Sequence, residues 1–156
     1  MRYLVIFFLA LLGTFIIDQA IKDIFVNGYY WDSKCISLEL HYNKGVAFSM
    51  LASLGPYVKW LQISLITIVL IFVFYEGYIK KFPFALGLLA GGAFGNIYDR
   101  FHHEGVVDYV AWHCGFDFAI FNYADVMIDI AIVWILIVSF IDERRLKKLE
   151  ENKKLK

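Results

Sequence analysis

The sequence predicts a mainly α-helical membrane protein with four transmembrane helices and a small extracytoplasmic β-sheet. Of its 156 residues, 60% are hydrophobic, and the mean hydropathy is +0.61, which is high for a water-soluble domain of this size. Four apolar segments approach the roughly 20 residues needed to cross a hydrocarbon core of about 30 Å. Between the first two, polar and apolar residues alternate as in a half-buried strand.

We expect the first two spans at residues 3–22 and 56–78. The first contains an uncharged run, residues 3–17, which reaches spanning length only if the helix continues through Asp18 and Lys22. A basic residue before an apolar run also resembles a cleaved signal peptide, but no small-residue cleavage site follows, so we expect an uncleaved helix. In the second span, Pro56 suits a first helical turn.

The third and fourth spans are expected at residues 82–98 and 122–141. The third is rich in Gly and Ala (ALGLLAGGAFG), a composition that favours close helix packing in a bilayer. The fourth carries Asp125 and Asp129 in its first two turns. Asn122 fits the N-cap position, which would place Asp125 at N3, where the helix dipole favours a carboxylate. All four spans form a single integral membrane domain, residues 1–156.

Lys and Arg residues set the expected orientation, because cytoplasmic loops are enriched in them. Arg2 precedes the first span, Lys80 and Lys81 join the second span to the third, and seven basic residues follow the fourth. Both termini are therefore expected in the cytoplasm, with residues 142–156 as a basic helical tail. The loops 23–55 and 99–121 then face outward.

Both outer loops carry β-strand signals. Residues 36–43 alternate strictly, and Asn43-Lys44-Gly45 makes a turn. Residues 107–111 alternate more weakly, and Gly115 is placed to close a hairpin into residues 116–121. The two cysteines, Cys35 and Cys114, lie one in each loop, so a disulfide between the loops is possible in an oxidising compartment.

Asp108 and Asp125 lie at the edge of an apolar segment, where an ionisable residue indicates a functional site. Two carboxylates close together share a proton, and the pair can polarise a water against a peptide carbonyl, as in aspartic proteases. Asp125 is the candidate for the ionised partner and Asp108 for the protonated one. The alternative is that Asp125 only caps its helix and Asp108 is an exposed loop acid.

Five motifs extend this interpretation. In chain order they are DQAIK at 18–22, NKGVAFS at 43–49, GGAFGNIYDR at 91–100, VVDY at 106–109 and FNYAD at 121–125. Together they resemble bacterial lipoprotein signal peptidase (signal peptidase II) over nearly the whole chain, to about residue 141. The resemblance implies an aspartic endopeptidase of the bacterial inner membrane. Such an enzyme removes the signal peptide from diacylglyceryl-modified prolipoproteins, cutting immediately before the lipidated cysteine.

The resemblance also implies a set of functional residues. Asp108 and Asp125 match the catalytic pair, and the surrounding polar residues map to Asp18, Asn43, Asn96, Arg100 and Asn122. No metal or organic cofactor is expected. The implied partners are lipidated prolipoproteins and membrane lipid, without nucleic acid, and the protein is expected to be a monomer that cyclic lipopeptides inhibit. The active site is expected at the outer face of the membrane.

The polar residues around the pair each have two interpretations. Asp18 and Lys22 are spaced i, i+4 and can pair to anchor the first span, which we favour over substrate contact. Arg100 offers donors for a peptide carbonyl or for lipid ester oxygens, which we favour over a snorkelling residue that pairs with Asp99. For Asn43 and Asn96 the choice is between satisfying a substrate backbone and serving a turn or a helix end.

Two features depart from this picture. Asp129 adds a third carboxylate one turn after Asp125. It would either disturb the titration of the pair or, as we favour, pair with a polar group on a neighbouring span or reach water in the site. His102, His103, Glu104 and His113 match no zinc-binding spacing, so a metal site is not expected.

Rival classes make different demands on the two acids. A transporter needs them in mid-membrane with a path to both sides, whereas here both acids gather at one face. A non-catalytic membrane scaffold would tolerate loss of either Asp. A presenilin-like intramembrane protease would need a glycine-flanked catalytic motif that the sequence lacks.

Overall fold

The structure is a computed structural model that describes residues 1–45, 52–116 and 118–154. A short 3-10 turn, Ala52–Leu54, precedes the second long helix. The helices and strands, in chain order, are α1 (Arg2–Val26), β1 (Trp31–Asp32), β2 (Ile36–Asn43), α2 (Tyr57–Tyr75), α3 (Tyr78–Lys81), α4 (Pro83–His102), β3 (Val106–Trp112) and α5 (Tyr123–Lys154). The second half of the 43–49 motif lies outside the described residues.

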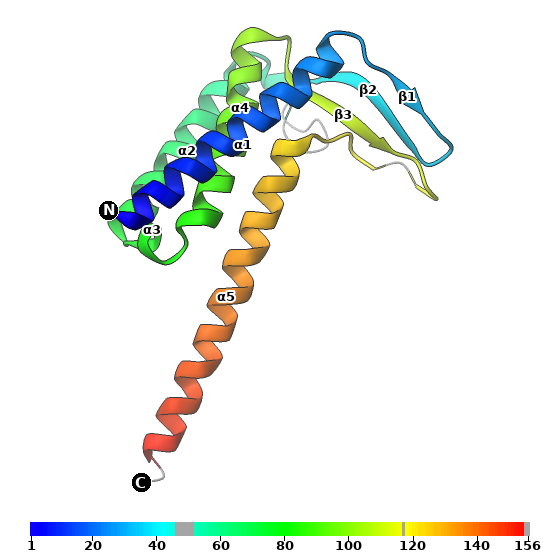
Figure 1. The fold of residues 1–156 in the computed structure, drawn as a ribbon. Coiled ribbons are helices and arrows are strands. Elements are labelled where there is room, and N and C mark those ends of the chain that lie inside the picture. The colour runs from blue at the N-terminus through cyan, green and yellow to red at the C-terminus, as the bar shows by residue number, and fades with distance from the viewer. Residues whose placement is uncertain (46–51, 117, 155–156) are drawn as a thin grey trace.

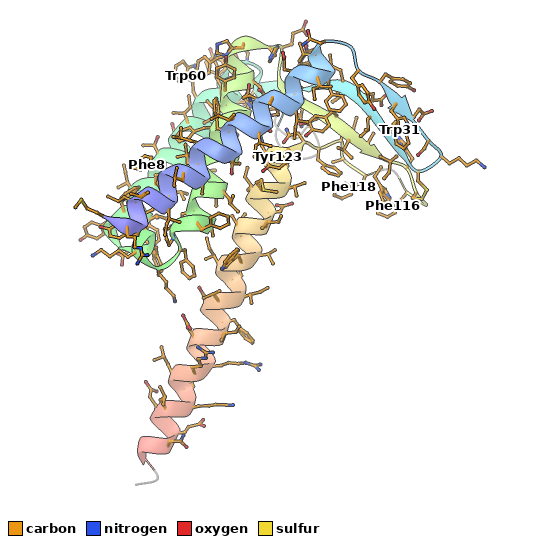
Figure 2. The ribbon with its side chains drawn as sticks, viewed as in Figure 1. Phe8, Trp31, Trp60, Phe116, Phe118 and Tyr123 are labelled. Carbon is orange, nitrogen blue, oxygen red and sulfur yellow. A yellow bond between two sulfur atoms is a disulfide. The ribbon has the colours of Figure 1, made fainter. Side chains whose placement is uncertain are left out.

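The expected fold class is confirmed. Helices α1, α2 and α5 are each long and apolar enough to cross a membrane, and the strands form one small sheet at one end of the helices (Figure 1). Many apolar side chains on the outer faces are exposed, such as Phe8 of α1 and Trp60 of α2, which Figure 2 labels. Helix α4 is 20 residues long and mostly buried; that it spans the membrane stays a prediction.

Helix α4 packs tightly between α1 and α5. A Cβ atom on Gly91 would lie 2.5 Å from the Leu11 carbonyl oxygen of α1, and one on Gly92 would lie 2.7 Å from the Ala124 carbonyl oxygen of α5. No side chain larger than hydrogen fits either place. The Gly-rich composition of this helix therefore lets three helix backbones approach closely, as expected for small residues in a bilayer.

The observed helices differ in length from the expected spans. Helix α1 continues past Lys22 to Val26, and α4 runs to His102. Helix α2 ends at Tyr75 rather than at residue 78, because Gly77 adopts a left-handed conformation (φ +73°) that starts the turn into α3. The basic tail continues α5 without a break, giving a helix of 32 residues.

The three strands form an antiparallel sheet in the order β1-β2-β3. The alternation at residues 36–43 correctly predicted β2, and the weaker alternation predicted β3. Their register places His41 opposite Asp108 and Asn43 opposite Val106. The site residues of the outer loops therefore lie at the end of the sheet next to the helices.

The hairpin expected at residues 116–121 forms only in part: the described residues return antiparallel to β3 but do not form a strand. Only an isolated bridge forms there, between Val110 and Phe121. The Phe121 carbonyl accepts the N–H groups of both Tyr109 and Val110, and α5 begins two residues later. The Phe118 N–H also donates to the Trp112 carbonyl (3.1 Å), so the segment lies beside β3 without the regular bonding of a strand. Figure 2 shows Phe116 and Phe118 on this segment, beneath the sheet.

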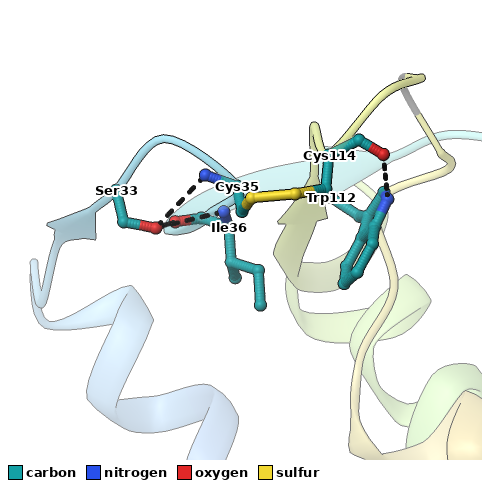
Figure 3. The surroundings of a disulfide bond; sticks show 5 residues. All are labelled: Ser33, Cys35, Ile36, Trp112 and Cys114. Carbon is teal, nitrogen blue, oxygen red and sulfur yellow. Dashed lines mark hydrogen bonds between the residues drawn. A yellow bond between two sulfur atoms is a disulfide. The ribbon is translucent and has the colours of Figure 1, made fainter.

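A disulfide joins Cys35 and Cys114, with the two Cα atoms 4.4 Å apart (Figure 3). It ties the residue before β2 to the segment after β3, so it closes the end of the sheet farther from the helices. The Ser33 hydroxyl accepts N–H groups from Cys35 and Ile36, which fixes the turn that carries the first cysteine. A crosslink between residues this far apart in sequence typically stabilises a fold by about 2–4 kcal/mol.

Candidate active site

The first turn of α5 is held by its own capping residues and by side chains from α1 and β3. Asn122 and Asp125 form a reciprocal capping box: the Asp125 N–H donates to Asn122 Oδ1 (3.0 Å) and the Asn122 N–H donates to Asp125 Oδ2 (3.1 Å). Between these two residues, the Tyr123 N–H donates to Tyr109 Oη (3.0 Å) and the Ala124 N–H donates to Asp18 Oδ1 (3.1 Å). The N-cap predicted at Asn122 is confirmed, and the cap fixes the position of Asp125.

Asp108 and Asp125 line one cavity of about 340 Å³. Asp108 Oδ1 accepts from Asn122 Nδ2 (2.7 Å) and its Oδ2 from Asn43 Nδ2 (3.0 Å). Asp125 Oδ1 accepts from Asn96 Nδ2 (2.8 Å), and its Oδ2 carries the capping bond. Each of the four carboxylate oxygens therefore accepts one N–H group. Such a pair is held rigidly while its remaining lone pairs stay available for a water or a proton.

The environment of Asp108 favours its protonated form. Its side chain is almost fully buried, and burial raises its pKa to about 7, with the charge of Asp125 acting in the same direction. The N–H groups of Asn43 and Asn122 oppose this rise because they stabilise the carboxylate. At neutral pH the pair can therefore hold one proton.

A buried ionic cluster lies behind the pair. Lys22, 2% exposed, binds Asp18 Oδ2 (2.8 Å) and Asp99 Oδ2 (2.7 Å), and both carboxylates are fully buried. The i, i+4 pair expected on α1 is thus formed, and Asp99 of α4 joins it. Because Asp18 also holds the start of α5, the cluster links α1, α4 and α5. Removing one partner of a buried ion pair typically costs about 3–5 kcal/mol, so the cluster is a major structural element.

Arg100 lines the cavity, and its partners do not include Asp99, with which one interpretation of the sequence paired it. It donates to Gln62 Oε1 of α2 (2.9 Å) and to the carbonyl of Gly45. Asp99, its neighbour in sequence, instead binds Lys22 and accepts the Val107 N–H (3.1 Å). The pairing of Arg100 with Asp99 is therefore wrong.

Sequence reasoning missed several residues of the cavity wall. Gln62 is one of them; a lone amide within an apolar segment was a signal that pointed to it. The segment before α5 supplies a second, apolar wall, for which the sequence held no signal. The apolar lining residues are Val106, Phe118, Ala119, Ile120, Phe121 and Ile128.

Asp129 is exposed and lines the same cavity. It also borders an apolar groove of about 540 Å³ that continues along α5 past Val133 and Ile137. Of the alternatives considered for this third carboxylate, the structure favours access to the site. Among the described residues it has no hydrogen-bond or ion-pair partner.

No group of three or more His, Cys, Asp or Glu side chains is arranged to bind a metal ion within the described ranges. The histidines considered from the sequence lie apart: His113 bonds Ser37 Oγ (3.0 Å), whereas the His103 ring stacks on Tyr42. The polar side chains that line the cavity are carboxylates, amides and one guanidinium.

Comparison with known proteins gives consistent matches. Residues 10–141 match the family model described as signal peptidase (SPase) II. A lipoprotein signal peptidase from Sulfurovum sp. (strain NBC37-1) is 60% identical over 140 residues, which cover 90% of this chain and 96% of the relative. One from Sulfurimonas denitrificans is 57% identical over 143 residues, covering 89% and 90%.

Solved structures agree with the sequence matches. One bacterial membrane enzyme, determined by the in meso method at 2.3 Å resolution, superposes with a TM-score of 0.72 at 28% identity, covering 86% of this chain and 87% of that chain. A second, at 1.9 Å resolution, gives a TM-score of 0.68 at 28% identity, covering 83% and 89%. The helices and the sheet are thus arranged as in bacterial membrane enzymes.

Proposed function

The chain belongs to the signal peptidase II family, and on this premise we propose that Asp108 and Asp125 are the catalytic pair with which it removes signal peptides from prolipoproteins. It is an aspartic endopeptidase embedded in a membrane. One observation supports the assignment most strongly: the two carboxylates line one cavity, and each of their oxygens accepts a fixed N–H donor.

The proposed reaction uses the two acids in different protonation states. Asp125 starts ionised at N3 of α5, where the helix dipole favours its charge, and it accepts a proton from the attacking water. Asp108 starts protonated and donates to the scissile carbonyl oxygen as the C–O bond forms. The tetrahedral intermediate then breaks its C–N bond, and the proton on Asp125 passes to the departing amine. Asp108 regains its proton as the carbonyl re-forms.

The other polar residues serve this pair in two ways. Asn43, Asn96 and Asn122 hold the carboxylates through N–H bonds. Arg100 faces the same cavity with a guanidinium whose donors can bind peptide or ester carbonyls of the substrate. Asp18 is fully buried and caps α5, so its role is structural.

The proposed substrate is a prolipoprotein with a diacylglyceryl cysteine, cut immediately before that cysteine. The apolar groove that runs from Asp129 along α5 supports this choice, since it offers acyl chains an apolar surface next to the cavity. A cyclic lipopeptide that places a hydroxyl between the two acids should inhibit. We propose that the protein acts as a monomer.

The proposed location is the bacterial inner membrane, with the chain as one integral domain and both termini in the cytoplasm. Arg2, Lys80 and Lys81 lie at the end of the bundle opposite the sheet (Figure 1). Lys81 also pairs with Asp142 of α5 (2.8 Å), so the basic tail begins at that end too. This supports a site on the outer face, because basic residues concentrate on the cytoplasmic side.

The test is to replace each acid by its isosteric amide. Asp108→Asn and Asp125→Asn should each lower the cleavage rate of a lipidated prolipoprotein by about 10³-fold or more, because an amide cannot exchange the catalytic proton. Asp32→Asn, an exposed change on β1, is the control and should keep full activity. Thermal unfolding shows whether each variant folds. Near-normal turnover in either amide variant of the pair would refute the assignment.

A further inference from the structure

The three asparagines around the catalytic pair all present their NH2 groups to it, and for two of them the backbone sets that orientation. Asn43 Oδ1 accepts the Gly45 N–H (3.0 Å), and Asn122 Oδ1 accepts the Asp125 N–H (3.0 Å). A backbone N–H can only donate, so each amide must turn its oxygen to it. The NH2 group on the other side is then directed at Asp108.

Asn96 is oriented by a side chain instead. Its Oδ1 accepts from Lys22 Nζ (2.9 Å) and from Asn122 Nδ2 (3.1 Å), while its Nδ2 donates to Asp125 Oδ1 (2.8 Å). An ammonium, like a backbone N–H, has donors only. Lys22 therefore orients the Asn96 amide, as backbone N–H groups orient the amides of Asn43 and Asn122.

We propose that Lys22 is a positioning residue of the catalytic pair, which fixes the Asn96 amide so that its NH2 group binds Asp125. This inference rests on the proposed function. Lys22 belongs to α1 and does not touch either catalytic acid. Without it, only Asn122 Nδ2 still holds the Asn96 oxygen. The amide can then turn that oxygen toward the Asp125 carboxylate more readily, which replaces a hydrogen bond with repulsion between lone pairs.

The ammonium is itself fully engaged. Its three hydrogens match three acceptors: Asp18 Oδ2, Asp99 Oδ2 and Asn96 Oδ1. Both carboxylates are held by other donors, since Asp18 Oδ1 accepts the Ala124 N–H and Asp99 Oδ1 accepts from Gln19 Nε2. The position of Lys22 is therefore determined from three directions, and it can act as a rigid support for Asn96.

The first experiment compares Lys22→Met with Gln19→Met in a cleavage assay on a lipidated prolipoprotein. Gln19 donates to Asp18 and Asp99 in the same cluster but to neither catalytic acid nor Asn96. Lys22→Met should lower kcat by about 10- to 100-fold, as expected for a misplaced catalytic group, with KM within about twofold. Gln19→Met should lower the Tm and leave kcat within about twofold. Equal kcat values for Lys22→Met and the parent would overturn the proposal.

A double-mutant cycle separates positioning from general stabilisation. If Lys22 acts through Asn96, adding Lys22→Met to Asn96→Ala should lower kcat by less than about twofold, measured in single turnovers with enzyme in excess. Losses that multiply would show that Lys22 acts by another route, and would overturn the proposal. The Asp108→Asn and Asp125→Asn variants are assayed in parallel, so a failure of the catalytic assignment is distinguished from a failure of the role of Lys22.

A charge-matched pair of variants covers the case in which Lys22→Met does not fold. Lys22→Met combined with Asp99→Asn removes one positive and one negative charge, so the buried cluster keeps its net charge. Its kcat is compared with that of Asp99→Asn alone, which retains the Lys22 bond to Asn96. A decrease of about tenfold or more supports the proposal, and a difference under twofold contradicts it.

Discussion

At the scale of single residues, the titration of Asp108 links the stability of the protein to its expected activity. Asp108 lies in β3, outside the helices, and its burial beside Asp125 raises its pKa to about 7. Because the folded state binds this proton more tightly than an unfolded chain does, Asp108 contributes most to stability at low pH. That contribution is lost as the pH rises from about 4 to about 7. The same titration should control activity.

We therefore expect kcat/KM to fall about tenfold per pH unit above pH 7, as the pair loses its shared proton. The measurement is a pH profile between about 5.5 and 9 with a substrate that has no ionisable group near the scissile bond. Asn43→Ala supplies the matched variant. Its missing N–H bond raises the pKa of Asp108 further, so the alkaline limb should move to higher pH. A flat profile, or a limb that Asn43→Ala leaves in place, contradicts the assignment.

The sequence could predict polar contacts between residues that are close along the chain, but not contacts between distant residues. The pair of Asp18 and Lys22 follows from helical geometry alone, as does the capping box at Asn122. The bonds from Lys22 to Asp99 and Asn96 join residues more than seventy positions apart, and no local pattern indicates them. The alternative in which Arg100 pairs with Asp99 is not formed, because consecutive helical residues do not face each other.

At the scale of elements, α4 determines how closely the helices approach the site. Its glycines contact two neighbouring helices: Gly87 and Gly91 face α1, whereas Gly92 faces α5. Since Asn96 and Asp99 are on the same helix, any displacement of α4 also moves the groups that support the catalytic pair.

Gly91→Ala should therefore lower both stability and activity. The new Cβ atom would lie 2.8 Å from the Thr14 Cβ as well as 2.5 Å from the Leu11 carbonyl oxygen, and overpacking of this kind costs about 1–3 kcal/mol. Gly13→Ala on α1 is the matched control, because its Cβ would meet no atom within 4 Å. Thermal unfolding in detergent gives the comparison. A Gly91→Ala protein as stable as Gly13→Ala would show that the helices are not in close contact there.

Sequence periodicity predicted most elements but not their ends. The alternation at residues 36–43 predicted β2 without knowledge of the partner strand, although burial in β2 does not follow it: Ser37 is buried and Leu40 is exposed. Strand β1, only two residues long, has no period to detect. The hairpin after Gly115 forms only in part, because its backbone bonds to β3 are irregular, and a pattern of side chains does not indicate such irregularity.

At the scale of the whole molecule, the distribution of charge relates the site to the membrane. The proposed catalytic pair and the sheet lie at one end of the helices, and the basic residues at the N-terminus, in α3 and after Asp142 lie at the other. Composition and basic residues sufficed to predict this arrangement from the sequence. The shape of the cavity could not be predicted, since six segments contribute to its wall: β2, α2, α4, β3, residues 118–121 and α5.

Reporter fusions test the orientation. Reporters placed after Lys81 and at the C-terminus should both report the cytoplasm, and one placed near Lys34 should report the outside, because cytoplasmic loops carry the basic residues. Lys34 lies in the turn between β1 and β2, so a fusion there leaves the helices intact. An outside C-terminus would move the catalytic pair to the wrong face of the membrane and contradict the proposed reaction.

The position of the pair at the end of the helices also bears on how the substrate is held. A scissile bond must reach the depth of Asp108 and Asp125, and an acylated cysteine is anchored near that depth by its own chains. Each buried methylene contributes about 0.8 kcal/mol to such anchoring. Two long chains therefore fix the depth of the peptide far better than an apolar signal helix alone, and the groove beside Asp129 offers them a surface.

Purified protein should accordingly cleave a lipidated prolipoprotein much faster than the same precursor without its lipid. The two precursors are compared at equal concentration in the same bilayer mimetic, with Asp108→Asn as the inactive control for both. If lipid serves to position the peptide, its loss should raise KM and also lower kcat, because a peptide at the wrong depth rarely brings its carbonyl to the pair. Equal rates for the two precursors would mean that the depth of the scissile bond is set by the signal helix itself, as in a general membrane protease.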